Sequence, residues 1–174
     1  MKLQQATIED LEDLIAFYEY VTDNTPGIAN YAQWQNGKHP TTEGIKAFVE
    51  EGSMYLYKEN AIVGALALTM YQDESYHGIE WTMPLTDDEV SAIHILAVSP
   101  DKQGAGIGAN IVRESIRLAK EKGKKAVRLD ATASNTPVHR LYERLGFVLK
   151  GKQRLYAENT GWLDFFFFEY DIPI

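Results

Sequence analysis

A glycine-rich run, Gln103-Gly104-Ala105-Gly106-Ile107-Gly108, restricts the fold of this chain more than any other feature. It follows a predicted strand, Ser91 to Val98, and leads into a predicted amphipathic helix, Gly106 to Lys122. Glycine lets the backbone turn sharply and lets a ligand approach it closely. The free amides at the start of a helix, together with the positive end of its dipole, attract anions. The run therefore predicts a phosphate-binding turn, and a purely steric role for its glycines is the alternative.

The same glycines also fit the dinucleotide-binding fingerprint, as Gly104-x-Gly106-x-x-Ala109. Asp130 follows about 20 residues later, near the end of the next predicted strand, where an acid that binds a ribose would lie. Two features oppose this interpretation. The residues from Ser99 to Gln103 separate the strand from the first glycine, whereas the dinucleotide turn is tight. The earlier elements are predicted to be antiparallel hairpins, and too little chain follows to build a doubly wound sheet.

Hydrophobic periodicity predicts one α+β domain over residues 1–174, with a mixed, mostly antiparallel sheet of about seven strands and about four helices. The predicted strands cover residues 2–6, 53–58, 61–71, 91–98, 126–131, 147–157 and 162–170. The predicted helices begin at Thr7, at Thr41 or Thr42, at Gly106 and at Pro137. Residues 23–41 and 72–88 are polar and are predicted to be loops.

Composition narrows the classes of function. The net charge of −8 is opposite in sign to that of a general nucleic-acid binder and suits a cationic substrate, although acidity also serves solubility alone. The absence of cysteine excludes disulfides, thiolate metal sites and an acyl-cysteine intermediate. The chain shows no signal segment and no apolar run of membrane-spanning length. We therefore expect a cytoplasmic protein with no metal and with no membrane or nucleic-acid partner.

Two stretches together are more specific than the glycines alone. The first combines a strand that ends in Val98-x-Pro100 with the spacing Gln103-x-x-Gly106-x-Gly108. The second is Asn135-x-x-Val138-x-x-Leu141-Tyr142-x-x-x-Gly146-Phe147. Both resemble the acetyl-coenzyme A motifs of the GNAT superfamily of N-acetyltransferases, and Val138 replaces a residue that is usually small. The resemblance covers Ser91 to Phe147, and the flanking elements match the family in order only.

The resemblance implies a single-domain GNAT fold in which strands 91–98 and 126–131 splay apart. Acetyl-coenzyme A would bind with its pantetheine arm along the open edge of the first strand and its phosphates on the glycine run. The implied cofactor-binding residues are Leu96, Ala97, Val98, Gln103, Gly104, Ala105, Gly106, Ile107, Gly108, Ala109 and Asn135. In the family, the position of Asn135 hydrogen-bonds the pantetheine arm, and a helix-capping role is equally natural.

Two side chains are candidates for acid–base chemistry. Tyr142 matches the general acid that protonates the departing thiolate in the family, and a core aromatic is its alternative role. His94 precedes Leu96 by two residues, so strand alternation predicts that both face the thioester site. Histidine can remove a proton near neutral pH. The setting His-x-Leu-Ala-Val resembles that of a base histidine in arylalkylamine acetyltransferases, whose companion histidine is Ala92 here.

The acceptor pocket has weaker signals. Aromatic faces attract amine cations, although loop aromatics also anchor a loop to its own core. The residues predicted to line the pocket are Tyr31, Trp34, His39, Glu80 and Trp81. The alternative bases are Glu80 and Glu89, acting directly or through water.

We therefore expect an acetyl-coenzyme A-dependent N-acetyltransferase that acts by direct attack in a ternary complex. Its acceptor would be a primary amine, in a small molecule or a peptide. A non-catalytic acyl-coenzyme A-binding module is the alternative from another class, and a dinucleotide-binding enzyme is less favoured. The run Phe165–Phe168 predicts a strand that is buried on both faces or in a homodimer contact.

Overall fold

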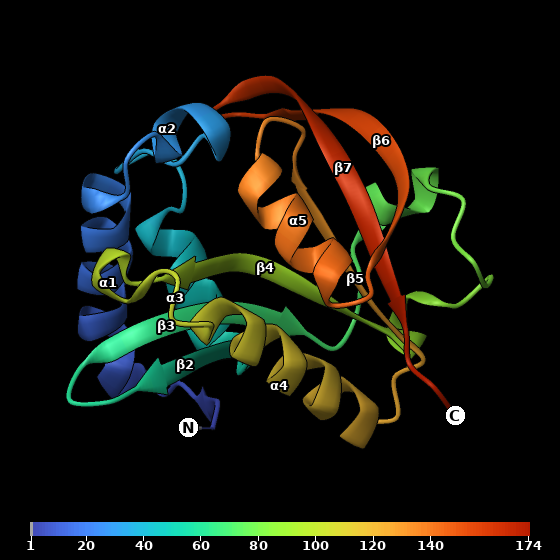
Figure 1. The fold of residues 1–174 in the computed structure, drawn as a ribbon, viewed down its shortest axis with the longest axis horizontal. Helices are drawn as coiled ribbons and strands as arrows, with labels where there is room; N and C mark the ends of the chain where they lie inside the picture. The colour runs from blue at the N-terminus through green and yellow to red at the C-terminus, as the bar shows by residue number, and fades with distance from the viewer. Residues whose placement is uncertain (1) are drawn as a thin grey trace.

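A seven-stranded sheet forms the centre of the molecule (Figure 1). The computed structural model describes residues 2–174, and the strands run in the order β1-β2-β3-β4-β5-β7-β6. Their bounds are Gln4–Gln5 (β1), Met54–Lys58 (β2), Ile62–Thr69 (β3), Val90–Val98 (β4), Ala126–Thr132 (β5), Val148–Ala157 (β6) and Gly161–Asp171 (β7). The pair β4–β5 is parallel and the other neighbouring pairs are antiparallel. The predicted sheet is therefore confirmed, and it is not the doubly wound sheet that the dinucleotide interpretation requires.

The four predicted helices are present, and a short fifth accompanies them within residues 2–174. The α-helices are Leu11–Asn24 (α1), Ile28–Tyr31 (α2), Thr42–Glu51 (α3), Ile107–Glu121 (α4) and Thr136–Arg144 (α5). The added helix, α2, is a single turn inside a region that was predicted to be a loop. Gly27 precedes it with a left-handed φ of 77°, which lets the chain turn into the helix. A 3-10 turn, Ile8–Asp10, comes before α1.

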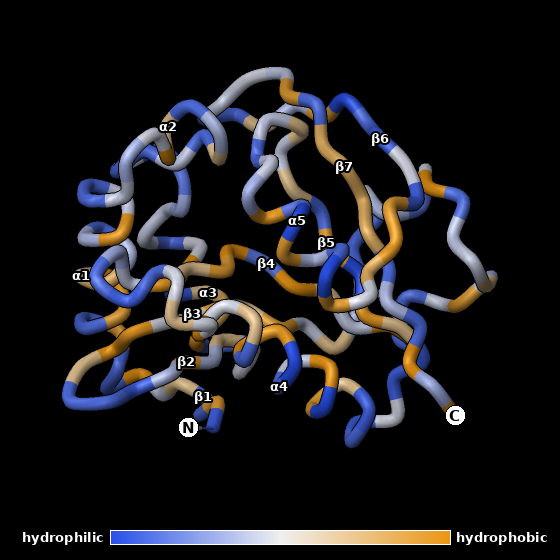
Figure 2. Tube along the Cα trace, in the orientation of Figure 1, coloured by the Kyte–Doolittle hydropathy of each residue, from blue (hydrophilic) through white to orange (hydrophobic). Residues whose placement is uncertain are grey.

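Helices cover both faces of the central strands, and each face has its own hydrophobic core. On one face, Ile111 of α4 and Tyr142 of α5 share a core with Leu66 of β3. On the other face, Leu14 of α1 and Ile45 of α3 share a core with Ala65 and Ala67 of β3. Because both faces are covered, β3 is buried along its whole length. Figure 2 shows hydrophobic central strands and a mostly hydrophilic edge strand, β6.

The strands β4 and β5 diverge, and this divergence positions the site. Their pairing runs from Val90 with Ala126 to Ile93 with Leu129 and then stops. Beyond this point β4 stays paired with β3, and β5 stays paired with β7 as far as Thr132. Each strand therefore follows its outer neighbour, and within residues 2–174 the inner edge of β4 after Ile93 has no strand partner. The splay that the family resemblance implied is confirmed.

A buried ion pair holds the loop between β3 and β4 against the sheet. Arg128 Nε donates to Glu169 Oε2 at 2.8 Å, and both side chains are almost fully buried. The same guanidinium donates to Gln72 at 2.8 Å and lies 4.1 Å from the centre of the Trp81 ring. Removing one partner of such a pair leaves a buried charge uncompensated, at a cost of about 3–5 kcal/mol. The loop is therefore held in one arrangement.

The run Phe165–Phe168 lies in β7. Phe167 and Phe168 are buried in different cores. This part of the strand is thus buried on both faces, as one of the two interpretations of the run predicted. No helix in residues 2–174 combines the length and the apolar character needed to cross a bilayer.

Candidate active site

The glycine run lies beside a cavity of about 550 Å³, which we call the glycine-loop cavity. Residues of β4, α4 and α5 line it, together with residues of α1 and α2. All but one of the residues expected to bind the cofactor line this cavity. They are Leu96, Ala97, Val98, Gln103, Gly104, Gly106, Ile107, Gly108, Ala109 and Asn135. The exception is Ala105, which borders a neighbouring groove with Lys102 and Arg113.

Two glycines of the run adopt a backbone conformation that other residues rarely reach. The angle φ is 82° at Gly104 and 79° at Gly106. Apart from each glycine and its two chain neighbours, no protein atom lies within 4 Å of the place where a Cβ would stand on either residue. The glycines are therefore required by the turn and not by packing, and the space beside them is open to a ligand.

The first turn of α4 supplies groups that can bind an anion. Within residues 2–174, the amides of Gly106, Ile107, Gly108 and Ala109 donate no hydrogen bond. Such orphan amides lie at the positive end of the helix dipole. This end of the glycine-loop cavity therefore fits a ligand that carries phosphate groups.

A β-bulge interrupts β4 where it leaves β5. Opposite Ala65 to Ala67 of β3, the stretch from His94 to Ala97 contains one residue more. Ile95 in this stretch has a φ of 44°, which is strained for a β-branched residue. The buried hydroxyl of Tyr18 donates to the Ile95 carbonyl oxygen at 2.8 Å. Helix α1 therefore holds the strained backbone in place.

The bulge corrects the expectation that His94 and Leu96 share a strand face. His94 stacks on Phe48 of α3, with the ring centres 5.7 Å apart. Leu96 packs instead against the core beneath α4 and α5. The expectation was wrong because side chains alternate regularly only in an uninterrupted strand, and the extra residue breaks the alternation. Both side chains still reach the gap between β4 and β5.

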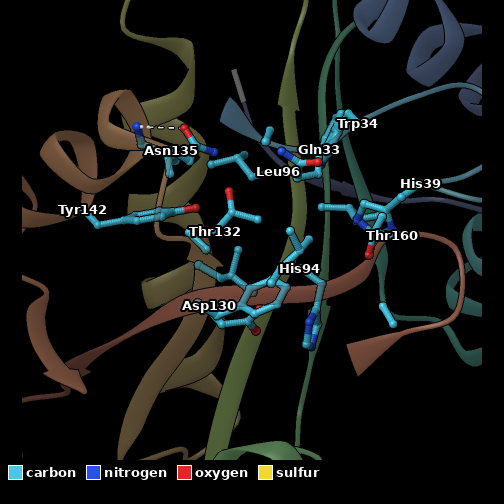
Figure 3. A pocket seen from close by; sticks show the side chains of 18 of the residues that line it. Gln33, Trp34, His39, His94, Leu96, Asp130, Thr132, Asn135, Tyr142 and Thr160 are labelled. Atoms are coloured by element: carbon cyan, nitrogen blue, oxygen red, sulfur yellow. Dashed lines mark hydrogen bonds between the residues drawn. The ribbon is translucent and has the colours of Figure 1, made fainter. Parts of the chain in front are cut away.

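A second cavity, of about 350 Å³, occupies this gap, and we call it the splay cavity (Figure 3). It shares Ala32, Trp34, Leu96, Asn135 and Val138 with the glycine-loop cavity. The two cavities therefore meet between the diverging strands. A ligand in one cavity can come into contact with a ligand in the other.

Tyr142 reaches the splay cavity from α5. Its ring lies 5.6 Å from that of Phe147 and 6.0 Å from that of Phe168, centre to centre, and this packing fixes its direction. Figure 3 shows the hydroxyl pointing into the cavity on the side of Leu96. Burial raises the pKa of Tyr142, and the negative charge of Asp130 raises it further. The phenol is therefore protonated at neutral pH and can donate a proton.

Thr69 orients the ring of His94. The Nε2 atom of His94 lies 3.3 Å from Thr69 Oγ1, and that hydroxyl donates to the Tyr71 carbonyl oxygen at 2.7 Å. Because the single hydroxyl proton is used in this way, we assign a hydrogen to Nε2 and the free lone pair to Nδ1. His94 can therefore accept a proton at Nδ1.

Asn135 lines both cavities and caps α5. Its Oδ1 accepts a long hydrogen bond, 3.4 Å, from the Val138 amide, which is the dashed line in Figure 3. The capping role is therefore present. Its Nδ2 has no acceptor in the part of the chain that the structure describes, so this group is available to a ligand.

Three of the residues predicted for the acceptor pocket border the cavities. Trp34 and His39 line the splay cavity, and Tyr31 lines the glycine-loop cavity. The His39 ring keeps contact with solvent, yet the surrounding protein removes enough water to lower its pKa, against the opposing charge of Asp130. Trp81 borders neither cavity, because Arg128 holds it elsewhere on the sheet.

The two glutamates considered as alternative bases also lie outside both cavities. Glu80 is exposed in the loop before β4. Glu89 lies just before β4, where it accepts from the Thr86 amide and is paired with Lys125. These hydrogen bonds, chiefly the one from Lys125, lower the pKa of Glu89 to about 2. Neither carboxylate is placed to act on a ligand between β4 and β5.

The splay cavity also contains polar residues that the sequence patterns did not predict, chiefly Asp130, Thr132 and Thr160. Asp130 had been considered only as an acid for a ribose. It follows Ala126–Leu129, which are all buried, and is the first residue of β5 beyond the pairing with β4. The sequence did contain one signal for Asp130 as a site residue, because a charged residue follows directly after a strand segment predicted to be buried.

Comparison with known proteins identifies a family. The family model described as "Acetyltransferase (GNAT) family" matches residues 8–147. An uncharacterized N-acetyltransferase of Methanocaldococcus jannaschii is 35% identical over 79 residues, which make up 43% of this chain and 35% of that protein. The chain thus spans about a third of the length of this relative.

Two solved structures have a similar fold. A GNAT-family acetyltransferase from Streptococcus agalactiae aligns with a TM-score of 0.80 at 15% identity, over 99% of this chain and 95% of its own. A Salmonella typhimurium protein solved with its cofactor acetyl-CoA aligns with a TM-score of 0.70 at 19% identity, over 100% of this chain and 95% of its own. At these identities the similarity concerns the fold alone.

The Tyr18 hydroxyl can be tested by Tyr18→Phe, which leaves the Ile95 carbonyl without its donor. We expect the free energy of unfolding, measured by urea denaturation, to fall by about 1–3 kcal/mol. Tyr20→Phe is the matched control, because Tyr20 lies on the same helix and its hydroxyl bonds the exposed Asp101. Its effect should stay within about 0.5 kcal/mol. Equal effects of the two variants would contradict a special role for Tyr18.

Proposed function

The chain belongs to the acetyltransferase (GNAT) family, and from this premise we propose that it transfers the acetyl group of acetyl-coenzyme A to a primary amine by direct attack in a ternary complex. The meeting of the two cavities between β4 and β5 carries the proposal. One cavity offers free helix amides to phosphates, and the other contains acid–base side chains. Donor and acceptor would therefore be bound at the same time, one in each cavity.

The groups around the glycine-loop cavity fit the donor. The orphan amides from Gly106 to Ala109 would bind its pyrophosphate. The unpaired edge of β4 would accept its pantetheine arm as an added strand, and Asn135 Nδ2 would donate to the same arm. When bound, the donor supplies a thioester carbonyl that an amine can attack. A backbone amide near Leu96 would stabilise the negative charge that develops on the carbonyl oxygen.

His94 and Tyr142 divide the proton transfers. His94 Nδ1 accepts a proton from the incoming ammonium group, and the free amine attacks the carbonyl carbon. As the new C–N bond forms and the C–S bond breaks, Tyr142 donates its proton to the sulfur. The nitrogen gives up two protons in total. One replaces the proton that Tyr142 donated, and the other leaves to solvent through His94.

Initial-rate kinetics test this function directly. Thiol release from acetyl-coenzyme A, measured against a panel of primary amines, should depend on both substrates and give intersecting double-reciprocal lines, because both must be bound before transfer. Parallel lines or a trapped acetyl-enzyme would contradict direct attack. Binding of coenzyme A without thiol release from any amine would instead indicate a non-catalytic acyl-coenzyme A-binding module.

Gly106→Glu tests the donor site. A carboxylate at this turn should repel phosphates, so the affinity for coenzyme A measured by isothermal titration should fall at least about tenfold. Gly123→Glu is the matched control. Gly123 follows the other end of α4 with a similar φ, 75°, and equally open space, so both variants have the same backbone strain. Equal losses of affinity would count against the glycine-loop cavity as the donor site.

Tyr142→Phe and His94→Ala test the division of proton transfers. Tyr142→Phe should lower kcat by about 10²–10⁴-fold and leave the coenzyme A affinity nearly unchanged, because the proton matters only as the thiolate leaves. An alkyl amine has a pKa of about 10, so it is almost wholly protonated at neutral pH. His94→Ala should therefore reduce the rate most at neutral pH and recover partly at high pH, where free amine is abundant.

His77→Ala serves as the histidine control, because His77 is exposed and paired with Asp87 outside both cavities. Its pH–rate profile should match that of the unmodified protein. A similarly unchanged profile for His94→Ala would reduce His94 to a packing role and assign the proton to Asp130 or water.

A further inference from the structure

The walls of the splay cavity are mainly apolar. Trp34 and Phe48 contribute aromatic surface from the N-terminal half of the chain, and Leu163 and Phe165 contribute apolar surface from β7. Cavities of this composition bind ligands whose bulk is apolar and orient them through a few polar groups. The body of the acceptor is therefore expected to be aliphatic or aromatic.

The charges around the same cavity are unequal. Among its described lining residues, Asp130 is the one carboxylate, and neither lysine nor arginine is present. The other ionisable side chains are His39, His94 and Tyr142. Loss of surrounding water lowers the pKa of His39, which disfavours the charged form of that ring. The cavity thus presents a negative charge to a ligand and lacks a lysine or arginine that could receive a ligand carboxylate.

A buried tyrosine holds Asp130 in place. Tyr76 donates to Asp130 Oδ1 at 2.5 Å and is itself almost completely buried. The rings of Trp81 and Phe167 pack against Tyr76, with centres 5.9 and 5.2 Å away. No lysine or arginine of residues 2–174 forms an ion pair with Asp130, so Oδ2 has no cationic partner. A half-buried carboxylate in this setting can bind a cation from outside the chain.

Asp130 also lies next to the candidate base. Ile93 and Leu129 form the last β4–β5 pair, so His94 and Asp130 are the first residues of the two strands beyond it. Figure 3 shows both side chains at the same end of the cavity. A cation bound to Asp130 would therefore lie beside His94.

We propose that Asp130 binds the ammonium group of the acceptor, and that the acceptor is an amine with an apolar or aromatic body and no carboxylate beside the amine. This assignment rests on the proposed function and names the substrate class. An α-carboxylate would lie close to Asp130 with no lysine or arginine to receive it, and like charges in such a site repel each other strongly. Free amino acids are therefore rejected, and their decarboxylated counterparts are accepted.

A matched pair of ligands, phenethylamine and phenylalanine, tests the assignment because they differ only in the α-carboxylate. Binding of each to the protein saturated with coenzyme A is measured by isothermal titration, and thiol release from acetyl-coenzyme A is measured alongside. Phenethylamine should bind at least about tenfold more tightly than phenylalanine and should have the higher kcat/KM.

Asp130→Asn keeps an oxygen that can accept from Tyr76 and removes the charge. It should weaken phenethylamine binding about tenfold or more and leave the affinity for coenzyme A unchanged. Asp164→Asn is the matched control, because Asp164 pairs with Lys152 outside the cavity. It should leave both affinities unchanged.

Three results would overturn the assignment. They are phenylalanine binding as tightly as phenethylamine, an unchanged phenethylamine affinity in Asp130→Asn, and no binding by any amine in a series from butylamine to phenethylamine. Amine binding that depends on Asp130, without thiol release from any amine, would leave the cation site standing and reject the proposed transfer.

Discussion

The unpaired inner edge of β4 is the constraint on which the rest of the structure depends. Backbone amides and carbonyls in a protein interior must find hydrogen-bond partners, and β5 supplies none beyond Ile93. Tyr18 satisfies the carbonyl of Ile95, and the packing of α1 brings its hydroxyl there. The remaining edge borders the two cavities, where a ligand that adds as a strand would complete the pairing. Completion of the sheet and binding of such a ligand would thus meet the same physical requirement.

The gap between β4 and β5 stays open because each of these strands remains hydrogen-bonded to its outer neighbour, β4 to β3 and β5 to β7. The β5 strand continues with β7, and the buried Arg128–Glu169 pair joins these two strands where the divergence begins. At the open end, the hydroxyls of Thr132 and Ser134 donate to the Tyr31 carbonyl oxygen at 2.6 and 2.7 Å. These hydrogen bonds connect β5 and the loop after it to α2 without pairing the strands. Both ends of the diverging part of β5 are therefore held in place, and this strand carries the polar side chains Asp130 and Thr132 of the splay cavity.

Features that depend on neighbouring residues in the chain could be predicted from the sequence, and features that depend on strand pairing could not. The glycine run and Tyr142 belong to local motifs, and the strands follow from hydrophobic periodicity. Nothing in the composition of β4 marks the extra residue near Ile95, so the break in alternation between His94 and Leu96 was not predicted. Trp81 was predicted to line the acceptor pocket, but Arg128 holds it elsewhere on the sheet. The two residues are far apart in sequence, so local patterns could not reveal their contact.

The splay cavity depends on segments outside the family motifs. The family model ends at residue 147, whereas Thr160, Leu163 and Phe165 of the splay cavity belong to the β6–β7 hairpin that follows. At the tip of this hairpin, Asn159 donates to the Lys38 carbonyl oxygen at 2.9 Å, which joins it to the loop that carries Trp34 and His39. Changes in either segment would reshape the splay cavity and leave the glycine run intact. Under the proposed function, one donor site could therefore serve different acceptors, so the acceptor has to be inferred from the splay cavity itself and not from the family.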